Sequence, residues 1–178
     1  MLVPAAACAL AGCHAAPPGV SPANGGLSDA QVAGVVLLAN NVEESYAALA
    51  ATRAVDPDVR SFAQRMATDH GALNAMLDEL LGRLELSPRD DAAGLALRDS
   101  SAARRDRLAA LPRASFDAAY VDVELRSHAE LLRVVDDLLV PSASAPALHE
   151  YVVTLRPVIT AHVAHAEQVR ATLAERRR

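Results

Sequence analysis

Apolar residues recur in steps of three and four along four stretches of this chain. Because an α-helix has about 3.6 residues per turn, such steps bring side chains onto one helical face. Each stretch therefore predicts one amphipathic helix with a buried seam, and the pattern as a whole indicates an all-α fold. The seam positions are Val32, Val35, Ala39, Val42, Tyr46 and Leu49; Val59, Phe62, Met66, His70, Leu73, Leu77, Leu80 and Leu84; Val121, Leu125, His128, Leu132, Val135 and Leu139; and Leu148, Val152, Leu155, Ile159, His162, Ala166, Val169 and Leu173.

Capping residues mark where the helices begin. Ser28, with Gln31 three residues later, has the pattern of a capping box, so the first helix is expected to begin there. Asp56 and Pro57 mark the start of the second helix, since Asp accepts from free N–H groups and proline suits the first helical position. The third helix is expected to begin near Ser115.

Prolines mark where the helices end or bend. Pro88 follows Ser87 and ends the second helix, and the Pro/Ser/Ala-rich residues 141–146 are expected to form the turn before the fourth helix. Pro157 lies inside the fourth helix, where it lacks a backbone donor. We expect it to kink the helix or split it in two, which would free the Val153 carbonyl.

Residues 89–111 form a polar connection between the second and third helices. They contain few apolar residues, so we expect a shorter helix that lies on the surface. Antiparallel neighbours do not need so long a connection, whereas ferritin-like bundles have a long crossover. The sequence thus predicts a ferritin-like four-helix bundle over residues 28–178, with a long helical crossover between helices two and three.

The N-terminus has the composition of an export signal. Residues 1–12 are apolar and uncharged. They are too few to span a bilayer, which takes about 20 residues, but they suit the core of a signal peptide. Residues 10–13 (Leu-Ala-Gly-Cys) resemble the bacterial lipobox, which predicts cleavage before Cys13 and lipidation of that residue. The usual basic start is missing, since the first arginine is Arg53. The alternative is an apolar N-terminus of a cytoplasmic protein.

Lipidation at Cys13 would place the protein on a membrane. The Pro/Gly-rich residues 13–27 would form a flexible tether, and Cys8 would leave with the signal peptide, so the mature domain would have no thiol. His14 stands where an Asp would indicate retention in the inner membrane. The expected location is therefore the bacterial cell envelope, as a periplasm-facing lipoprotein on the outer rather than the inner membrane.

Composition narrows the range of partners. The net charge is -5, which argues against general nucleic-acid binding. Every basic side chain is arginine, and no pattern identifies a protein partner.

Three histidines occupy seam positions where apolar residues are expected. His70, His128 and His162 each lie near the middle of a different predicted helix. Burying an ionisable ring is unfavourable unless it is paired or bound to a ligand, so three such rings predict one polar site inside the bundle. Neutral imidazole is the commonest metal ligand among side chains, which makes these residues candidate ligands.

Nearby carboxylates could complete the site. We expect Glu44 to join His70, His128 and His162 as the inner set. Three further residues are expected as outer partners or alternate ligands: Asp69, Glu124 and His165. The alternative is a hydrogen-bonded core cluster that makes stability depend on pH.

The sequence does not favour a di-iron centre. Such a site takes a Glu-x-x-His pair from each of two helices. The residues three positions before the seam histidines are Ala67, Leu125 and Ile159. A mononuclear centre holding Zn, Cu or Fe is more reasonable.

Several motifs resemble those of a known family. They are residues 60–66 (Arg-Ser-Phe-Ala-Gln-Arg-Met) followed by Asp69-His70; Phe116-Asp117-x-x-Tyr120-Val121 with His128; Pro157 with His162 and Ala166; and Glu44 with Leu49-Ala50. Over residues 27–173 the chain resembles the bacterial family called domain of unknown function 4142. The resemblance implies an exported, ferritin-like four-helix protein of the kind called outer-membrane proteins, without an established activity. It also implies that Glu44, His70, His128 and His162 are the polar positions of the family.

Two hypotheses about function follow. The first is a membrane-anchored protein of the cell envelope that binds one transition metal through a His/carboxylate centre. The alternative is a structural or interaction lipoprotein with a hydrogen-bonded histidine cluster and no metal. An oxidoreductase acting on peroxide or a metal ion would need an open coordination position and ranks last. The sequence leaves enzymatic activity open and gives it the least support.

Overall fold

The computed structural model describes residues 26–176 of the chain. The predicted signal peptide, Cys13 and most of the predicted tether lie outside these residues. Within them the regular structure is helical throughout and contains no strand, which confirms the all-α prediction. The elements are α1 (Asp29–Arg53), α2 (Pro57–Leu84), α3 (Ala92–Ala110), α4 (Arg113–Val134), η1 (Val135–Leu139), α5 (Val140–Ser142) and α6 (Pro146–Arg176).

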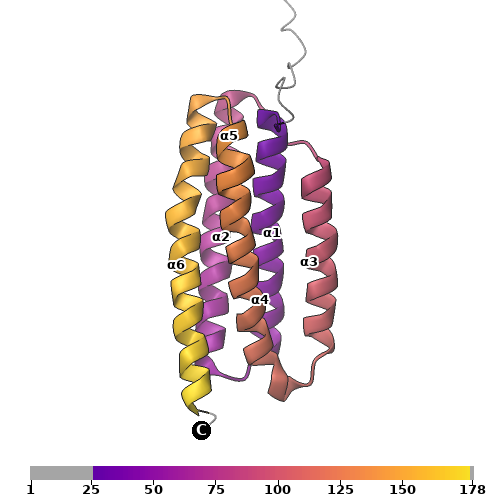
Figure 1. The fold of residues 1–178 in the computed structure, drawn as a ribbon, viewed down its shortest axis with the longest axis vertical. Helices are drawn as coiled ribbons and strands as arrows, with labels where there is room; N and C mark the ends of the chain where they lie inside the picture. Colours follow the sequence, from indigo (N-terminus) through magenta and orange to yellow (C-terminus); the bar gives the residue numbers. More distant parts are fainter. Residues whose placement is uncertain (1–25, 177–178) are drawn as a thin grey trace, which may run out of the picture.

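Four long rods form the body of the molecule, and α3 packs on its outside. α1 and α2 make one antiparallel hairpin, and α4 and α6 make another (Figure 1). After α2, the chain returns through α3, which packs against α1 and α4 and brings the chain back to the end at which α2 began. α4 therefore runs in the same direction as α2 (Figure 1). The polar segment 89–111 therefore does form a helical crossover between the two hairpins.

The predicted helix starts agree with the structure to within two residues. Ser28 and Gln31 form a reciprocal capping box at the start of α1, and the Asp56 side chain accepts from the Asp58 N–H at the start of α2. α4 begins at Arg113, directly after Pro112.

Two prolines have a different effect on the helices than expected. Pro141 does not lie in the turn but within α5, which continues α4 through the π-helical element η1. There the Val140 N–H donates to the Val135 carbonyl, five residues back. α6 is not split at Pro157 but runs unbroken from Pro146 to Arg176. Val153, which stands four residues before Pro157, is 46% exposed, so water can hydrogen-bond a carbonyl left without a partner there.

The bundle has two apolar clusters, one toward each end. One contains Val36, Leu77, Val135, Leu148 and Ile159, among others. The other is built around Tyr46, Phe62, Met66, Phe116 and Val169. Both clusters take residues from all four rods, and in each rod the predicted polar positions fall between the two sets. A polar layer therefore crosses the bundle between two apolar blocks.

Polar contacts hold the crossover helix against α1. The Tyr46 hydroxyl donates to the Ser101 carbonyl (3.1 Å), and Arg53 donates to the Ala109 carbonyl (2.8 Å).

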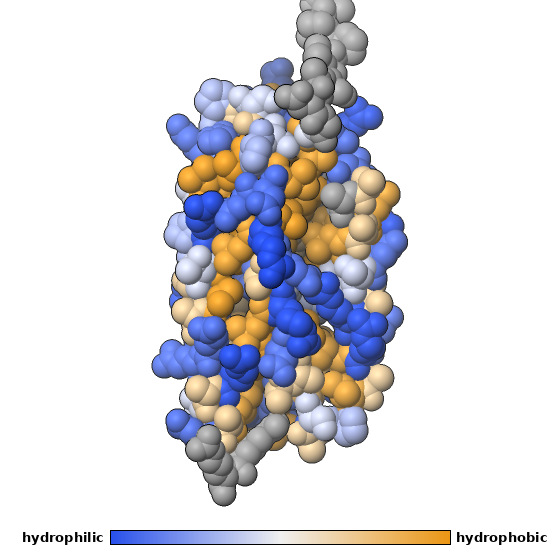
Figure 2. Space-filling view, viewed as in Figure 1, coloured by the Kyte–Doolittle hydropathy of each residue, from blue (hydrophilic) through white to orange (hydrophobic). Residues whose placement is uncertain are grey.

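On the outer face over α4, hydrophilic side chains form a band bordered by apolar ones (Figure 2). None of the described helices is both long and apolar enough to span a membrane.

Candidate metal centre

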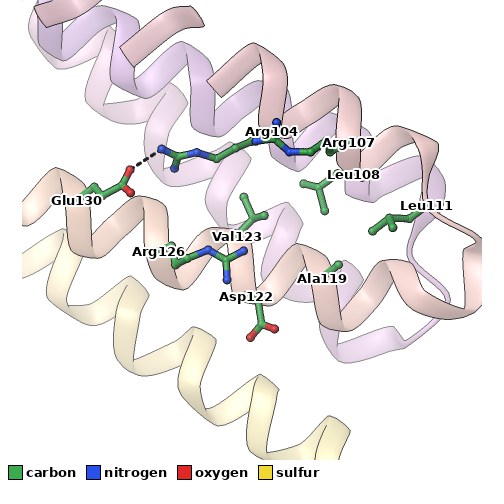
Figure 3. Close-up of a pocket in the computed structure, with 9 residues that line it drawn as sticks. All are labelled: Arg104, Arg107, Leu108, Leu111, Ala119, Asp122, Val123, Arg126 and Glu130. Carbon is green, nitrogen blue, oxygen red and sulfur yellow. Dashed lines mark hydrogen bonds and ion pairs between the residues drawn. The ribbon is translucent and has the colours of Figure 1, made fainter. Parts of the chain in front are cut away.

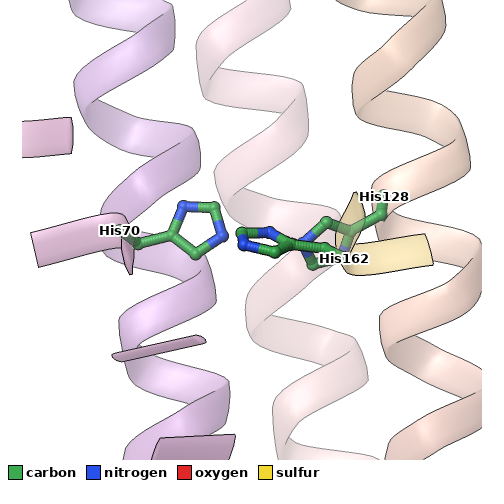
Figure 4. Close-up of side chains that lie close together, drawn as sticks. All are labelled: His70, His128 and His162. Atoms are coloured by element: carbon green, nitrogen blue, oxygen red, sulfur yellow. The ribbon is translucent and has the colours of Figure 1, made fainter. Parts of the chain in front are cut away.

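Three histidine rings from three helices meet in the polar layer. His70 on α2, His128 on α4 and His162 on α6 are all buried, at 2%, 1% and 4% exposure. The ring centroids lie 5.7 Å apart for His70 and His128 and 5.2 Å apart for each of the other two pairs. The rings point toward one another, and one nitrogen from each lies within 4.8 Å of the others (Figure 4). The predicted convergence is thus present.

Each ring has one nitrogen against a hydrogen-bond acceptor on the outside of the cluster. His70 Nδ1 lies 3.0 Å from Asn40 Oδ1, and His128 Nδ1 lies 2.9 Å from the Glu124 carbonyl oxygen. His162 Nε2 lies 3.0 Å from Asp69 Oδ2. Since all three partners accept, each outer nitrogen must carry the proton of its ring. In a neutral ring the inner nitrogen is then a lone pair.

The orientation of the Asn40 amide is itself fixed. Its Nδ2 donates to Asn74 Oδ1 (2.9 Å), so its oxygen must face His70. Asn74 Nδ2 in turn donates to Glu44 Oε1 (3.1 Å). A chain of two amides thus joins His70 to a carboxylate on the surface side of the bundle.

The inner nitrogens of His128 and His162 face each other. His128 Nε2 and His162 Nδ1 are 3.2 Å apart, and His70 Nε2 has no hydrogen-bond partner among the residues that the structure describes. Two lone pairs at this distance repel each other unless a proton or a cation lies between them. In a tetrahedral zinc site with Zn–N bonds of 2.0–2.1 Å, ligand nitrogens are about 3.3 Å apart. The His128–His162 distance already matches that value.

Burial favours the neutral form of the His70 and His162 rings. Desolvation lowers the pKa of His70 from 6.5 to about 4, and it also lowers the pKa of His162. Burial alone would raise the pKa of Asp69, but hydrogen bonds from Arg65 and His162 outweigh it and lower that pKa. At neutral pH the His70 and His162 rings are therefore in the form in which imidazole binds metals, and His162 faces an ionised carboxylate, a common second partner of a ligating histidine.

A pair of buried carboxyl groups lies on the other side of the His128 ring. His128 Nδ1 is 3.5 Å from Glu124 Oε2 and 4.0 Å from Glu43 Oε2, and both glutamates are completely buried. Burial, together with the negative charge of Glu43, raises the pKa of the Glu124 carboxyl well above its ordinary value. Ser127 Oγ donates to Glu43 Oε1. Glu43, Glu124 and His128 make a second group whose ligand atoms are mutually within 4.8 Å.

The structure replaces Glu44 by Glu43 as the α1 glutamate that reaches the histidines. Glu44 is partly exposed, ends the amide chain from Asn74 and belongs to neither group of converging ligand atoms within the described residues. Adjacent helical residues point about 100° apart, so only one of the two could face the interior. The buried seam of α1 in fact passes through Val36, Asn40, Glu43, Ala47 and Ala50. Steps of three and four from Val36 would have found it.

The outer candidates differ in position. Asp69 bonds His162, and Glu124 lies beside His128, so both adjoin the cluster. His165 does not join it. Its ring lies about one helical turn beyond His162, is only partly buried, and packs edge-on against Phe62 with 5.1 Å between centroids. Asn40 and Asn74 were not predicted, since nothing in the sequence distinguishes them from other helical amides.

A surface recess of about 410 Å³ lies between α3 and α4, away from the histidine cluster (Figure 3). Arg104 pairs there with Glu130 at 2.7 Å, and Arg107, Asp122 and Arg126 line its walls. None of the residues of the histidine cluster lines it. Its opposite charges partly neutralise one another, so it does not extend the candidate centre.

Comparison with known proteins supports both the family and the fold. Residues 14–169 match the family described as Domain of unknown function (DUF4142), which confirms the resemblance seen in the sequence. A crystal structure of a DUF305 fragment from Deinococcus radiodurans is similar, with a TM-score of 0.70 and 17% sequence identity, over 81% of this chain and 95% of that one. At this identity the similarity concerns the fold alone. No curated protein sequence matches the chain.

Proposed function

The chain belongs to the DUF4142 family, and we propose that it is a helical protein of the cell envelope that binds one divalent transition-metal ion through His70, His128 and His162. One observation carries the metal proposal. An acceptor lies against the outer nitrogen of each ring, so in neutral rings three lone pairs converge in a buried layer. A cation bound between them would satisfy all three.

The donor set limits the choice of metal. Neutral imidazoles suit Zn, Cu, Fe and Ni, whereas Mg and Ca prefer oxygen ligands. The Asp69 carboxylate, the Asn40 amide and the Glu124 carbonyl would act as outer partners that orient the ligating rings. His128 and His162 already have the nitrogen separation of such a site, whereas His70 Nε2 would have to move closer when the metal binds.

Export and lipidation form the second part of the proposal. The Leu-Ala-Gly-Cys motif at residues 10–13 supports it. Mass spectrometry of the protein from a bacterial membrane fraction should find a mature N-terminus at Cys13 carrying lipid, and Cys13→Ala should release the domain from the membrane. An unlipidated chain that retains residues 1–12 would contradict this part without affecting the metal proposal.

Metal binding can be tested on untagged protein. Titration with Zn²⁺ or Co²⁺ should give a stoichiometry of one ion per chain, and tetrahedral Co²⁺ should give visible absorption bands. His70→Ala, His128→Ala and His162→Ala should each lose the ion, whereas His165→Ala should keep it, since that ring lies outside the cluster. Circular dichroism checks that each variant remains helical.

The alternative is a structural lipoprotein with a hydrogen-bonded histidine cluster. It predicts no bound metal after purification, no uptake on titration and no rise in melting temperature with added ion. Those results would contradict the metal proposal. A rise in melting temperature that disappears in His70→Ala would support it, because a ligand that binds the folded state alone stabilises that state.

A further inference from the structure

Asp69 connects the buried cluster with the surface. The side chains of His70, His128, Glu43 and Glu124 are 0–2% exposed, whereas the side chain of Asp69 is 22% exposed. Its Oδ2 atom nevertheless lies 3.0 Å from His162 Nε2. Of the cluster and its direct partners within residues 26–176, Asp69 is the one that solvent reaches most readily.

Asp69 and His162 line a groove on the outside of the bundle. The groove lies between α2 and α6 and has a volume of about 400 Å³. Its remaining lining consists of Arg65, Ala72, Leu73, Pro157, Val158 and Ala161. Ala72 and Ala161 are both exposed, and their small side chains take up little of the space in the groove that His162 also lines.

His162 has one nitrogen facing the interior of the bundle and the other facing the groove. Its Nδ1 faces His128 in the interior, and its Nε2 faces Asp69 in the groove. The ring therefore lies between the groove and the inner nitrogen of His128. A rotation of this side chain into the groove would open that route.

Arg65 forms an ion pair with Asp69 on the solvent side. Arg65 Nε lies 2.5 Å from the same Oδ2 atom that faces His162. The Arg65 side chain is 64% exposed, and exposed pairs of this i,i+4 kind are weak. The guanidinium can therefore leave the carboxylate at little cost when another cation arrives.

We infer that the α2–α6 groove is the route by which a divalent transition-metal ion enters and leaves the histidine cluster. This inference rests on the proposed function. The hydrated ion displaces Arg65 and meets the Asp69 carboxylate, then exchanges its waters for the inner nitrogens as the His162 ring moves aside and returns. No proton needs to leave His162 Nε2, which donates to Asp69 again once Nδ1 has bound the ion.

The test is to narrow the groove without changing the ligands. Ala161→Leu places a larger side chain at the groove floor, and Ala164→Leu is the matched control, since Ala164 is also exposed on α6 but does not line the groove. Stopped-flow absorption measures Co²⁺ uptake by the full chain and release into excess chelator. Because a narrowed route adds the same barrier in both directions, Ala161→Leu should slow both rates by at least about tenfold and leave Kd unchanged. Ala164→Leu should match the wild type.

The substitution Arg65→Gln should change the rate of Co²⁺ uptake in the opposite direction. Removing the competing cation should speed Co²⁺ uptake severalfold at low salt, whereas Arg83→Gln, which breaks the similar Arg83–Glu79 pair elsewhere on α2, should not. The inference is overturned if Ala161→Leu exchanges Co²⁺ as fast as Ala164→Leu, or if only its release rate changes, since a leucine that weakens the site would do that. A wild-type chain that takes up no Co²⁺ contradicts the proposed function itself, so the two failures are distinguishable.

Discussion

The free energy of unfolding of the metal-free protein should fall as the pH falls from 6.5 to about 4, because of His70. The folded protein keeps this ring neutral, because burial lowers its pKa from 6.5 to about 4. Between these two values the unfolded chain binds a proton that the folded chain does not. Unfolding therefore takes up a proton, and acid favours the unfolded state. The contribution of the ring is present above pH 6.5 and is lost progressively toward pH 4.

The size of the effect follows from the shift. One pKa unit corresponds to about 1.36 kcal/mol, so a shift from 6.5 to about 4 amounts to about 3.4 kcal/mol in total. Relative to pH 8, the free energy of unfolding should drop by about 2 kcal/mol at pH 5 and about 3 kcal/mol at pH 4 through His70 alone. The lowered pKa of His162 adds a loss of the same sign.

The assay is urea unfolding with a chelator present, from pH 8 to pH 4, on the wild type and on His70→Gln. Glutamine does not titrate and keeps a polar amide at this position. The carboxyl groups titrate in both proteins, so the difference between the two curves isolates His70. The wild type should lose about 2 kcal/mol more than the variant by pH 5. Parallel curves would refute the claim that this ring is buried without its proton.

Two pairs of substitutions test the scaffold by the same unfolding measurement. The buried Asp117 carboxylate accepts from the backbone N–H groups of the α1–α2 connection, so Asp117→Ala should cost about 2 kcal/mol, whereas the exposed Asp137→Ala should stay within about 0.5 kcal/mol of the wild type. A Cβ at Gly34 would lie 2.1 Å from the Arg89 carbonyl oxygen, so Gly34→Ala must displace the connection to α3 and should destabilise. Gly82 has open space around it, so Gly82→Ala should stabilise the helix by about 0.5–1 kcal/mol. Equal effects at the two glycines would contradict the packing of this connection.

Much of the fold follows from local signals in the sequence. The capping box at Ser28 and the Asp56-Pro57 pair act within one helical turn, so the sequence reveals them directly. The polar segment between helices two and three predicts a crossover because a hairpin would not need its length. The π-helical turn at Val135–Leu139 was not predictable, since it depends on how the end of α4 packs against the rest of the bundle.

The three histidines were predictable because each interrupts an apolar seam at a similar depth. The error at Glu44 has a different origin. The first helix buries small and polar residues along with its valines, so its sequence allows two overlapping seams that differ by about 100°. Contact with the other helices selects between them. The outer partners Asn40 and Asn74 likewise emerge only when α1 and α2 are side by side.

Charge balance connects the histidine cluster with the carboxyl groups around it. A divalent ion held by three neutral imidazoles would bring two positive charges into a layer that solvent hardly reaches, which is unfavourable unless negative charge lies close by. Asp69, with its lowered pKa, supplies one such charge at His162. The Glu43–Glu124 pair beside His128 retains a proton, because the pKa of Glu124 is raised, and so supplies one more. Once Arg65 has left Asp69, the layer is neutral with a divalent ion and carries a net negative charge without one. The proposed centre therefore favours a divalent ion over a monovalent ion by charge as well as by its nitrogen ligands.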